Sequence, residues 1–111
     1  MDMASDIYTG TLDVLILKAL TWGPMHGYAI NRWITERAGE AVNVNEGALY
    51  PALHRLETRG LLSEEWGRTE RNREAKFYSL TTEGRAFLRR EVARWNTYAR
   101  VVTATLAATR A

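Results

Sequence analysis

The feature that most constrains the fold is the segment from Asn45 to Gly60, which is typical of a two-faced helix. Leu49, Leu53 and Leu56 recur at spacings of three and four residues, so they lie on one face. The opposite face carries small or polar residues, namely Gly47, Pro51, His54 and Thr58. A leucine face needs a core, whereas an outer face with so little bulk suits close approach to a groove. The segment is therefore a candidate recognition helix.

Pro51 leaves the start of this helix open. In a helix that begins at Glu46, the Pro51 ring faces the carbonyl of Gly47 and removes one backbone hydrogen bond. Either the helix begins later, or its first turn is irregular near the glycine. Asn43 or Asn45 can cap its N-terminus.

Two further helices are predicted upstream. The residues from Thr11 to Trp22 carry apolar side chains at helical spacing, and Asp13 falls in the first turn, where a negative charge complements the helix dipole. The Gly-Pro pair at 23–24 ends this helix. The second helix runs from about His26 to Ala38, and we expect His26 to serve as a local cap.

The hydrophobic period changes after the third helix. Side chains alternate from Leu62 to Trp66 and from Ala75 to Leu80, around a wholly polar run from Gly67 to Arg73. Two alternating runs around a polar loop predict a β-hairpin. Three helices followed by a hairpin is the order of a winged helix-turn-helix, so we expect a mainly α fold in which the polar loop is the wing.

The last segment predicts one helix from about Thr82 to Ala108, roughly 40 Å long at 1.5 Å per residue. Its apolar residues are spaced 4, 3, 4, 3, 4 and form a heptad seam: Leu88, Val92, Trp95, Ala99, Val102 and Leu106. If the helix folded back on the first helix, the distal seam would stay uncovered, so we expect a second subunit to cover it. Residues 1–81 would form the winged helix-turn-helix domain, and 82–111 the dimerisation helix.

Composition narrows the possible chemistry. The chain has 111 residues, 46% of them apolar, which suits one domain with a core. The absence of cysteine excludes disulfides, zinc ribbons and thiol catalysis. No metal-ligand spacing, catalytic triad, carboxylate pair or phosphate loop is present, so we expect no enzyme activity, metal or cofactor. No apolar run approaches membrane-spanning length, and we expect a cytoplasmic protein.

The cationic side chains are almost all arginine, with 13 Arg and 2 Lys, although the net charge is only +2. Arginine suits planar, bidentate contacts with phosphates and guanine edges. A genomic bias toward arginine codons explains the same excess equally well. Charge alone therefore does not require a nucleic-acid partner.

Four stretches resemble the PadR family of transcriptional regulators, in order and at the family's spacing: GTLDVLILKAL at 10–20, GPMHGYAI at 23–30, GALYPALHRLE at 47–57 and AKFYSLT at 75–81. The wing, with Glu65-Trp-Gly67 and Arg71-Asn-Arg73, looks like the short subclass common in acidobacteria. The resemblance implies a homodimeric repressor that binds double-stranded DNA at an inverted-repeat operator and is often released by a small molecule. An adaptor that uses the seam only for protein contact is the alternative.

Candidate DNA contacts follow from the fold and the resemblance. The family's tyrosine at the place of Tyr50 implies a phosphate contact, with packing under the wing as the alternative. His54 and Arg55 can reach base edges, although Arg55 has Glu57 or Glu46 as possible ion partners. The remaining candidates lie on the second helix, the third helix and the wing: Tyr28, Asn31, Asn45, Gly47, Pro51, Thr58, Arg68, Arg71, Asn72, Arg73 and Lys76.

The wing has a simpler alternative, a solvated hairpin crossed by Glu–Arg ion pairs, because Glu70 and Glu74 lie among its cations. Trp95 also has two interpretations. In multidrug-responsive relatives, a tryptophan at this place in the helix stacks on flat aromatic ligands, which implies an aromatic effector near Trp95, Tyr98, Tyr8 and Asp13. The alternative is that Trp95 only packs the dimer interface.

Overall fold

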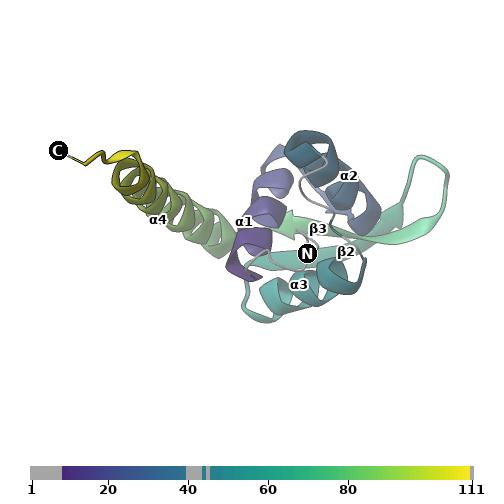
Figure 1. Cartoon of the computed structure of the whole chain (residues 1–111). Coiled ribbons are helices and arrows are strands. Elements are labelled where there is room, and N and C mark those ends of the chain that lie inside the picture. The colour runs from purple at the N-terminus through teal and green to yellow at the C-terminus, as the bar shows by residue number, and fades with distance from the viewer. Residues whose placement is uncertain (1–8, 40–43, 45, 111) are drawn as a thin grey trace.

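The computed structural model describes residues 9–39, 44 and 46–110. Its elements are α1 (Thr9–Ala19), the short 3₁₀ helix η2 (Leu20–Trp22), β1 (Met25–His26), α2 (Gly27–Ala38), α3 (Glu46–Thr58), β2 (Leu62–Arg68), β3 (Glu74–Leu80) and α4 (Thr82–Ala107) (Figure 1). The predicted mainly helical winged helix-turn-helix fold is confirmed.

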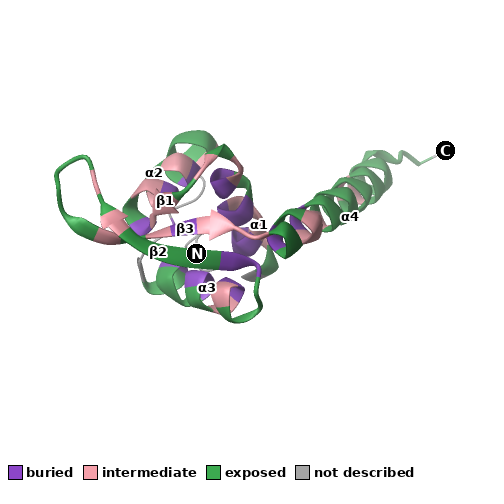
Figure 2. Cartoon of the chain, turned by 180° about the vertical axis from the view of Figure 1, so that it is seen from behind, coloured by how far each residue is buried: buried purple, intermediate pink, exposed green. Residues whose placement is uncertain are grey.

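Helix α1 lies at the centre of the fold and contacts α2, α3 and α4. Its Ile16 and Leu17 are fully buried, and so is Leu53 on the leucine face of α3. Because each helix turns one apolar face toward α1, the core forms between the helices and the inner face of the sheet. The opposite face of α3 is left at the surface (Figure 2).

The predicted hairpin is present, but the sheet has three strands rather than two, in the order β1-β3-β2. Strands β2 and β3 pair from Leu62 opposite Leu80 to Arg68 opposite Glu74. The additional strand, β1, pairs His26 with Phe77 on β3. A strand of two residues has no alternation to detect, which is why the sequence did not predict it. Its consequence is that the N-terminus of α2 is attached to the base of the wing.

The structure corrects one predicted helix start and decides another that the sequence left open. Helix α1 begins at Thr9, so Asp13 lies beyond the first turn and is not placed to complement the dipole there. Helix α3 begins at Glu46 with Pro51 inside it, so the later start is wrong. Asn45, a candidate cap and DNA contact, and Tyr8, a candidate effector contact, lie outside the described residues.

Helix α4 begins against the winged domain and then leaves it (Figure 1). The Thr81 hydroxyl caps it by accepting a hydrogen bond from the Gly84 backbone N–H at 2.9 Å. Leu88 is buried, whereas the distal part of the helix projects into solvent (Figure 2). The molecule is therefore elongated and measures 63 × 31 × 21 Å with this helix included. Within the described ranges, no helix is both long enough and apolar enough to cross a membrane.

Candidate nucleic-acid interface

The outer face of α3 is exposed as the spacing predicts. Gly47, Pro51, His54 and Thr58 all lie at the surface, while the leucines of the same helix are buried. No bulky apolar side chain projects from this row of four residues, so a groove wall can approach the helix closely. His54 is its one ring side chain able to exchange hydrogen bonds with base edges.

Tyr50 lies beside the first turn of α2 and is 47% exposed. A Cβ atom built on Gly27 would fall 2.8 Å from the Tyr50 hydroxyl oxygen, so a glycine is needed at that position for the ring to lie there. Tyr50 therefore packs against α2 while keeping about half of its surface in solvent, and it also lines the groove toward the wing.

The α2 residues have separate roles. Tyr28 is 66% exposed. The Asn31 side-chain amide instead donates to the Val44 carbonyl at 2.6 Å, which ties α2 to the segment before α3. His26 is the predicted local cap, because its Nδ1 accepts a hydrogen bond from the Ala29 backbone N–H at 3.2 Å. Tyr28 is thus available for contact, whereas Asn31 already has a structural partner.

Arg55 is held by an acid that the sequence did not suggest. Its Nη2 lies 3.0 Å from Oδ1 of Asp13 on α1, whose residue surface is only 5% exposed. Arg55 thus pairs with Asp13 rather than with Glu57, one of the two alternative partners; the side chain of the other, Glu46, lies outside the described residues. Burial raises the pKa of Asp13, and the hydrogen bond and charge of Arg55 only partly oppose that rise. The two partners are 42 positions apart in the sequence, so no local pattern indicates this contact.

The wing tip is a tight turn with exposed arginines. Asn72 has a φ of 60°, and its backbone N–H donates to the Thr69 carbonyl at 2.8 Å. Arg68 donates to the Asn72 carbonyl at 3.1 Å. Across the described part of the chain, no ion pair joins Arg68, Arg71 or Arg73 to a carboxylate. This observation disfavours a hairpin crossed by Glu–Arg pairs.

Lys76 differs from the wing arginines because it is paired. Its Nζ lies 3.3 Å from Oε1 of Glu64 on the neighbouring strand and 5.7 Å from the centre of the Trp66 ring. Glu64 also lies beside Glu57 of α3, and a hydrogen bond between the two carboxyl groups when Glu57 holds the proton raises the pKa of Glu57 and lowers that of Glu64. The junction of α3 and the wing is therefore a polar network, which the sequence did not predict.

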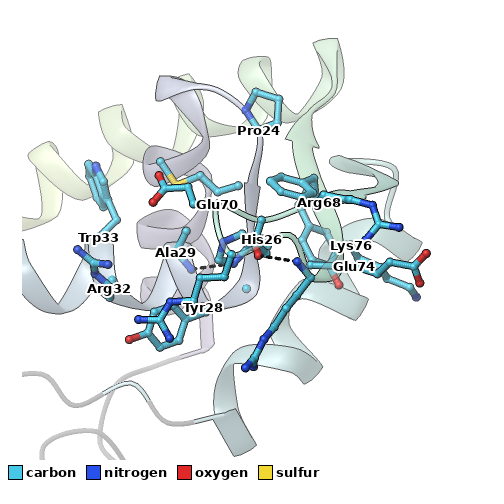
Figure 3. Close-up of a pocket in the computed structure, with 18 of the residues that line it drawn as sticks. Pro24, His26, Tyr28, Ala29, Arg32, Trp33, Arg68, Glu70, Glu74 and Lys76 are labelled. Carbon is cyan, nitrogen blue, oxygen red and sulfur yellow. Dashed lines mark hydrogen bonds between the residues drawn. The ribbon is translucent and has the colours of Figure 1, made fainter.

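A groove of about 1250 Å³ lies between α2 and the wing (Figure 3). Its cationic lining residues are Arg32, Arg37, Arg68, Arg71, Arg73 and Lys76, against the acids Glu36, Glu70 and Glu74. Arg32 and Arg37 share Glu36, at 3.4 and 3.8 Å. Among these lining residues, the cations that form no ion pair within the described residues are therefore the wing arginines, Arg68, Arg71 and Arg73. A cationic wing wall facing Tyr28 and Tyr50 suits an extended anionic ligand.

The seam of α4 is fully buried only at its start, where Leu88 is 7% exposed. Beyond it, Val92 is 38% exposed, Trp95 55% and Leu106 80%, while Ala99 and Val102 are half-buried. Trp95 also lies beside Tyr98, with ring centres 5.8 Å apart. Asp13, expected beside them, is instead enclosed in the core with Arg55. Within the described residues, no His, Cys, Asp and Glu side chains group in a way that could hold a metal ion.

Comparisons with known proteins agree with the fold. A model described as the transcriptional regulator PadR-like family matches residues 16–90. An uncharacterised protein of Lysinibacillus sphaericus is 31% identical over 91 residues, which are 82% of this chain and 84% of that protein.

Two crystal structures extend the match. A PadR family transcriptional regulator from Eggerthella lenta is 32% identical with a TM-score of 0.78, over 90% of this chain and 85% of that one. A PadR family transcription regulator from Clostridium difficile is 30% identical with a TM-score of 0.77; the match covers 86% of this chain and 98% of that one. The family model spans the last turn of α1, all of α2 and α3, the wing and the start of α4. The chain belongs to the PadR-like family of transcriptional regulators.

Proposed function

We propose that the chain is a homodimeric repressor that binds an inverted-repeat DNA operator through α3 and the wing. The observation that carries this proposal is the set of three exposed wing arginines that lack carboxylate partners in the described residues. An unpaired arginine can neutralise a phosphate without first breaking an ion pair. The bare outer face of α3 then enters the major groove, and the wing contacts the flanking phosphates or the minor groove.

Most of the candidate residues have a role in this proposal. His54 reads a base edge, while Gly47, Pro51 and Thr58 let the α3 backbone lie close to the DNA. Tyr28, Tyr50, Arg68, Arg71 and Arg73 contact phosphates, and Asn72 shapes the turn that presents the arginines. Asn31 supports the site through its bond to the Val44 carbonyl. Specificity then depends on DNA shape as much as on base contacts.

The dimer in this proposal forms along α4. The exposed apolar residues of the distal seam support a second copy as the covering partner, because a lone helix would leave them in water. Residues 1–81 bind the DNA and 82–111 join the two copies, which places half-sites about one helical turn apart. The wing motif supports assignment to the short acidobacterial-type subclass.

A flat aromatic effector is the proposed ligand of the dimer. The adjacent rings of Trp95 and Tyr98 support this, because both are more than half exposed and could stack on such a molecule. The effector would change the angle between the two DNA-binding heads rather than cover the DNA surface. In a cytoplasmic repressor, this change releases the operator.

The test begins with selection of bound duplexes from a random DNA library by the wild-type protein, followed by gel shifts on the selected duplex. The variant H54A/R71A/R73A should lose binding, while R94A/R100A, which removes two exposed arginines of α4, should keep it. Flat aromatic cations also bind duplex DNA, so the effector is tested without DNA: tryptophan fluorescence of wild type and of W95F is titrated with aromatic ligands, and quenching should be lost in W95F. If no duplex is enriched, or if the triple variant binds as tightly as wild type, the proposal is wrong.

A further inference from the structure

The ion pair between Asp13 and Arg55 joins two helices that are otherwise held by apolar contacts. Asp13 lies within α1 between residues of the core, and its side chain is 7% exposed. Arg55 reaches it from α3 with 42% of its side chain exposed. Because α1 also contacts α4, this pair connects the DNA-facing helix to the helix that supports the dimer.

A second arginine, Arg59, directly follows α3 and makes a similar contact about one turn after Arg55. The guanidinium of Arg59 lies 4.8 Å from the centre of the Phe87 ring on α4. The Arg59 backbone N–H donates to the Arg55 carbonyl at 3.0 Å, which continues the helical hydrogen bonding just past α3. Arg55 and Arg59 therefore hold the C-terminal end of α3 against α1 and α4. Two directional contacts at this end restrict rotation and sliding of α3 in a way that leucine packing alone does not.

The energetics of the pair favour a directional role over a stabilising one. Burial raises the pKa of Asp13 even though Arg55 and Arg59 both act to lower it. The ionised carboxylate is therefore held less favourably in the folded chain than in water. Apolar residues in place of a buried ion pair are often as stable or more stable. What a carboxylate and a guanidinium add at this place is geometry.

We propose that Arg55 is a positioning residue for DNA binding, which holds α3 at the correct rotation through the buried carboxylate of Asp13 and does not itself contact DNA. The proposal rests on the proposed function, since it concerns how the same DNA site is held. It assigns a DNA-binding role to Asp13, a buried acid that touches no nucleic acid. It also leaves His54 as the base-reading side chain of the central part of α3.

The two possible roles of Arg55 predict opposite effects of Asp13→Asn. If Arg55 contacts DNA, loss of the acid frees a cation, and binding stays equal or becomes tighter. If Arg55 positions α3, loss of the acid lets the helix rotate, and binding becomes weaker although a negative charge has been removed. Electrostatics and positioning thus act in opposite directions in this variant.

The experiment measures fluorescence anisotropy of the full-length chain on the library-selected duplex at 10 °C, with circular dichroism showing that each variant is folded. Asp13→Asn should weaken binding about threefold to thirtyfold, the range of mutations that act through coupling. The matched control is Glu91→Gln, which also removes the acid of an ion pair. Glu91 lies 3.0 Å from Arg94 within α4, and this variant should bind DNA as wild type does. Equal or tighter binding by folded Asp13→Asn would overturn the proposal.

Arg55→Met gives an independent measurement if Asp13→Asn does not fold. Positioning predicts weaker binding with an unchanged slope of log K against log salt concentration. A direct phosphate contact predicts a slope shallower by about 0.9 per subunit, which overturns the proposal. The double variant D13N/R55M should bind no more weakly than the weaker single variant, because both remove one interaction. Failure of the wild type to select any duplex would instead refute the proposed function itself.

Discussion

Lys76 and Glu64 show how single charges adjust the DNA face. The carboxylate of Glu64 lies 3.3 Å from the Lys76 ammonium, so it partly neutralises one wing cation. Glu64 also brings a negative charge to the junction with α3, where the proposed DNA path runs. An acid at such a place weakens binding to a polyanion and shortens the lifetime of non-specific contacts.

Glu64→Gln should therefore tighten DNA binding. The change removes a negative charge and frees Lys76, and we expect an affinity increase of about twofold to fivefold, the range of exposed ion pairs. Fluorescence anisotropy at fixed salt measures it. Glu65→Gln is the matched control, since it makes the same charge change on the opposite face of β2. An equal gain in both variants would show that only net charge matters and would contradict a role for the pair.

Asp13 should make folding stability depend on pH. Its pKa is raised in the folded chain, so the folded protein holds the proton more tightly than the unfolded chain does. Stability from this group is present at low pH and is lost as pH rises from the unfolded value toward the raised folded value. Urea unfolding of wild type and Asp13→Asn across acidic pH isolates the effect. A stability difference between the two that does not change with pH would contradict it.

Of these residue-scale features, the sequence predicts those that depend on spacing within one element, and not the ion pairs between elements. The outer face of α3 could be predicted because spacing along one helix decides it. The pairs Lys76–Glu64 and Asp13–Arg55 could not, because the first depends on strand register and the second on how α1 crosses α3. Both are tertiary contacts between residues that the local pattern treats as surface charges.

At the scale of elements, the direction of α4 depends on the contact between its first turn and the segment that links α3 to β2. Gly84 lies against the backbone carbonyl of Leu61, and a Cβ atom built there would overlap that oxygen. The Leu61 carbonyl also accepts a hydrogen bond from the Thr81 backbone N–H at 3.2 Å. A backbone atom held in this way cannot move aside, so glycine is required.

Gly84→Ala should destabilise the chain by about 1 to 3 kcal/mol, the usual cost of overpacking, although alanine is the better helix former. Thermal unfolding followed by circular dichroism measures this change. Gly10→Ala is the matched control, because a Cβ built on that α1 glycine meets nothing within 4 Å. The control should be neutral or slightly more stable. A Gly84→Ala variant as stable as the control would contradict the close contact.

Elements long enough to repeat their hydrophobic spacing several times could be predicted from the sequence, whereas shorter elements could not. The long α4 and the β2–β3 hairpin follow from repeated spacing, and the leucine face of α3 does so as well. Strand β1 was missed because only its pairing with β3 defines it. The sequence left the start of α3 open because a proline inside a helix removes a backbone hydrogen bond, which argues against a start at Glu46. The helix nevertheless begins at Glu46 and contains Pro51.

At the scale of the whole molecule, a winged domain carries a projecting helix whose apolar seam is mostly uncovered. Val102→Asp should dissociate the proposed dimer, because a buried charge on each side of the seam repels its copy. Sedimentation velocity measures the change, and DNA affinity should fall with it. Thr97→Asp, exposed and off the seam, should remain dimeric. A monomeric wild type, or a dimeric Val102→Asp, would contradict assembly along α4.

The central claim is that two copies bind one duplex through the arginines of their wings, and salt dependence tests it most directly. If each subunit neutralises about three phosphates, the slope of log K against log salt should be near −5 for wild type on the selected duplex. Removing four arginines from the dimer with R71A/R73A should change the slope to about −2, while R94A/R100A keeps it near −5. A wild-type slope near zero, or a wing variant with the wild-type slope, would contradict the claim.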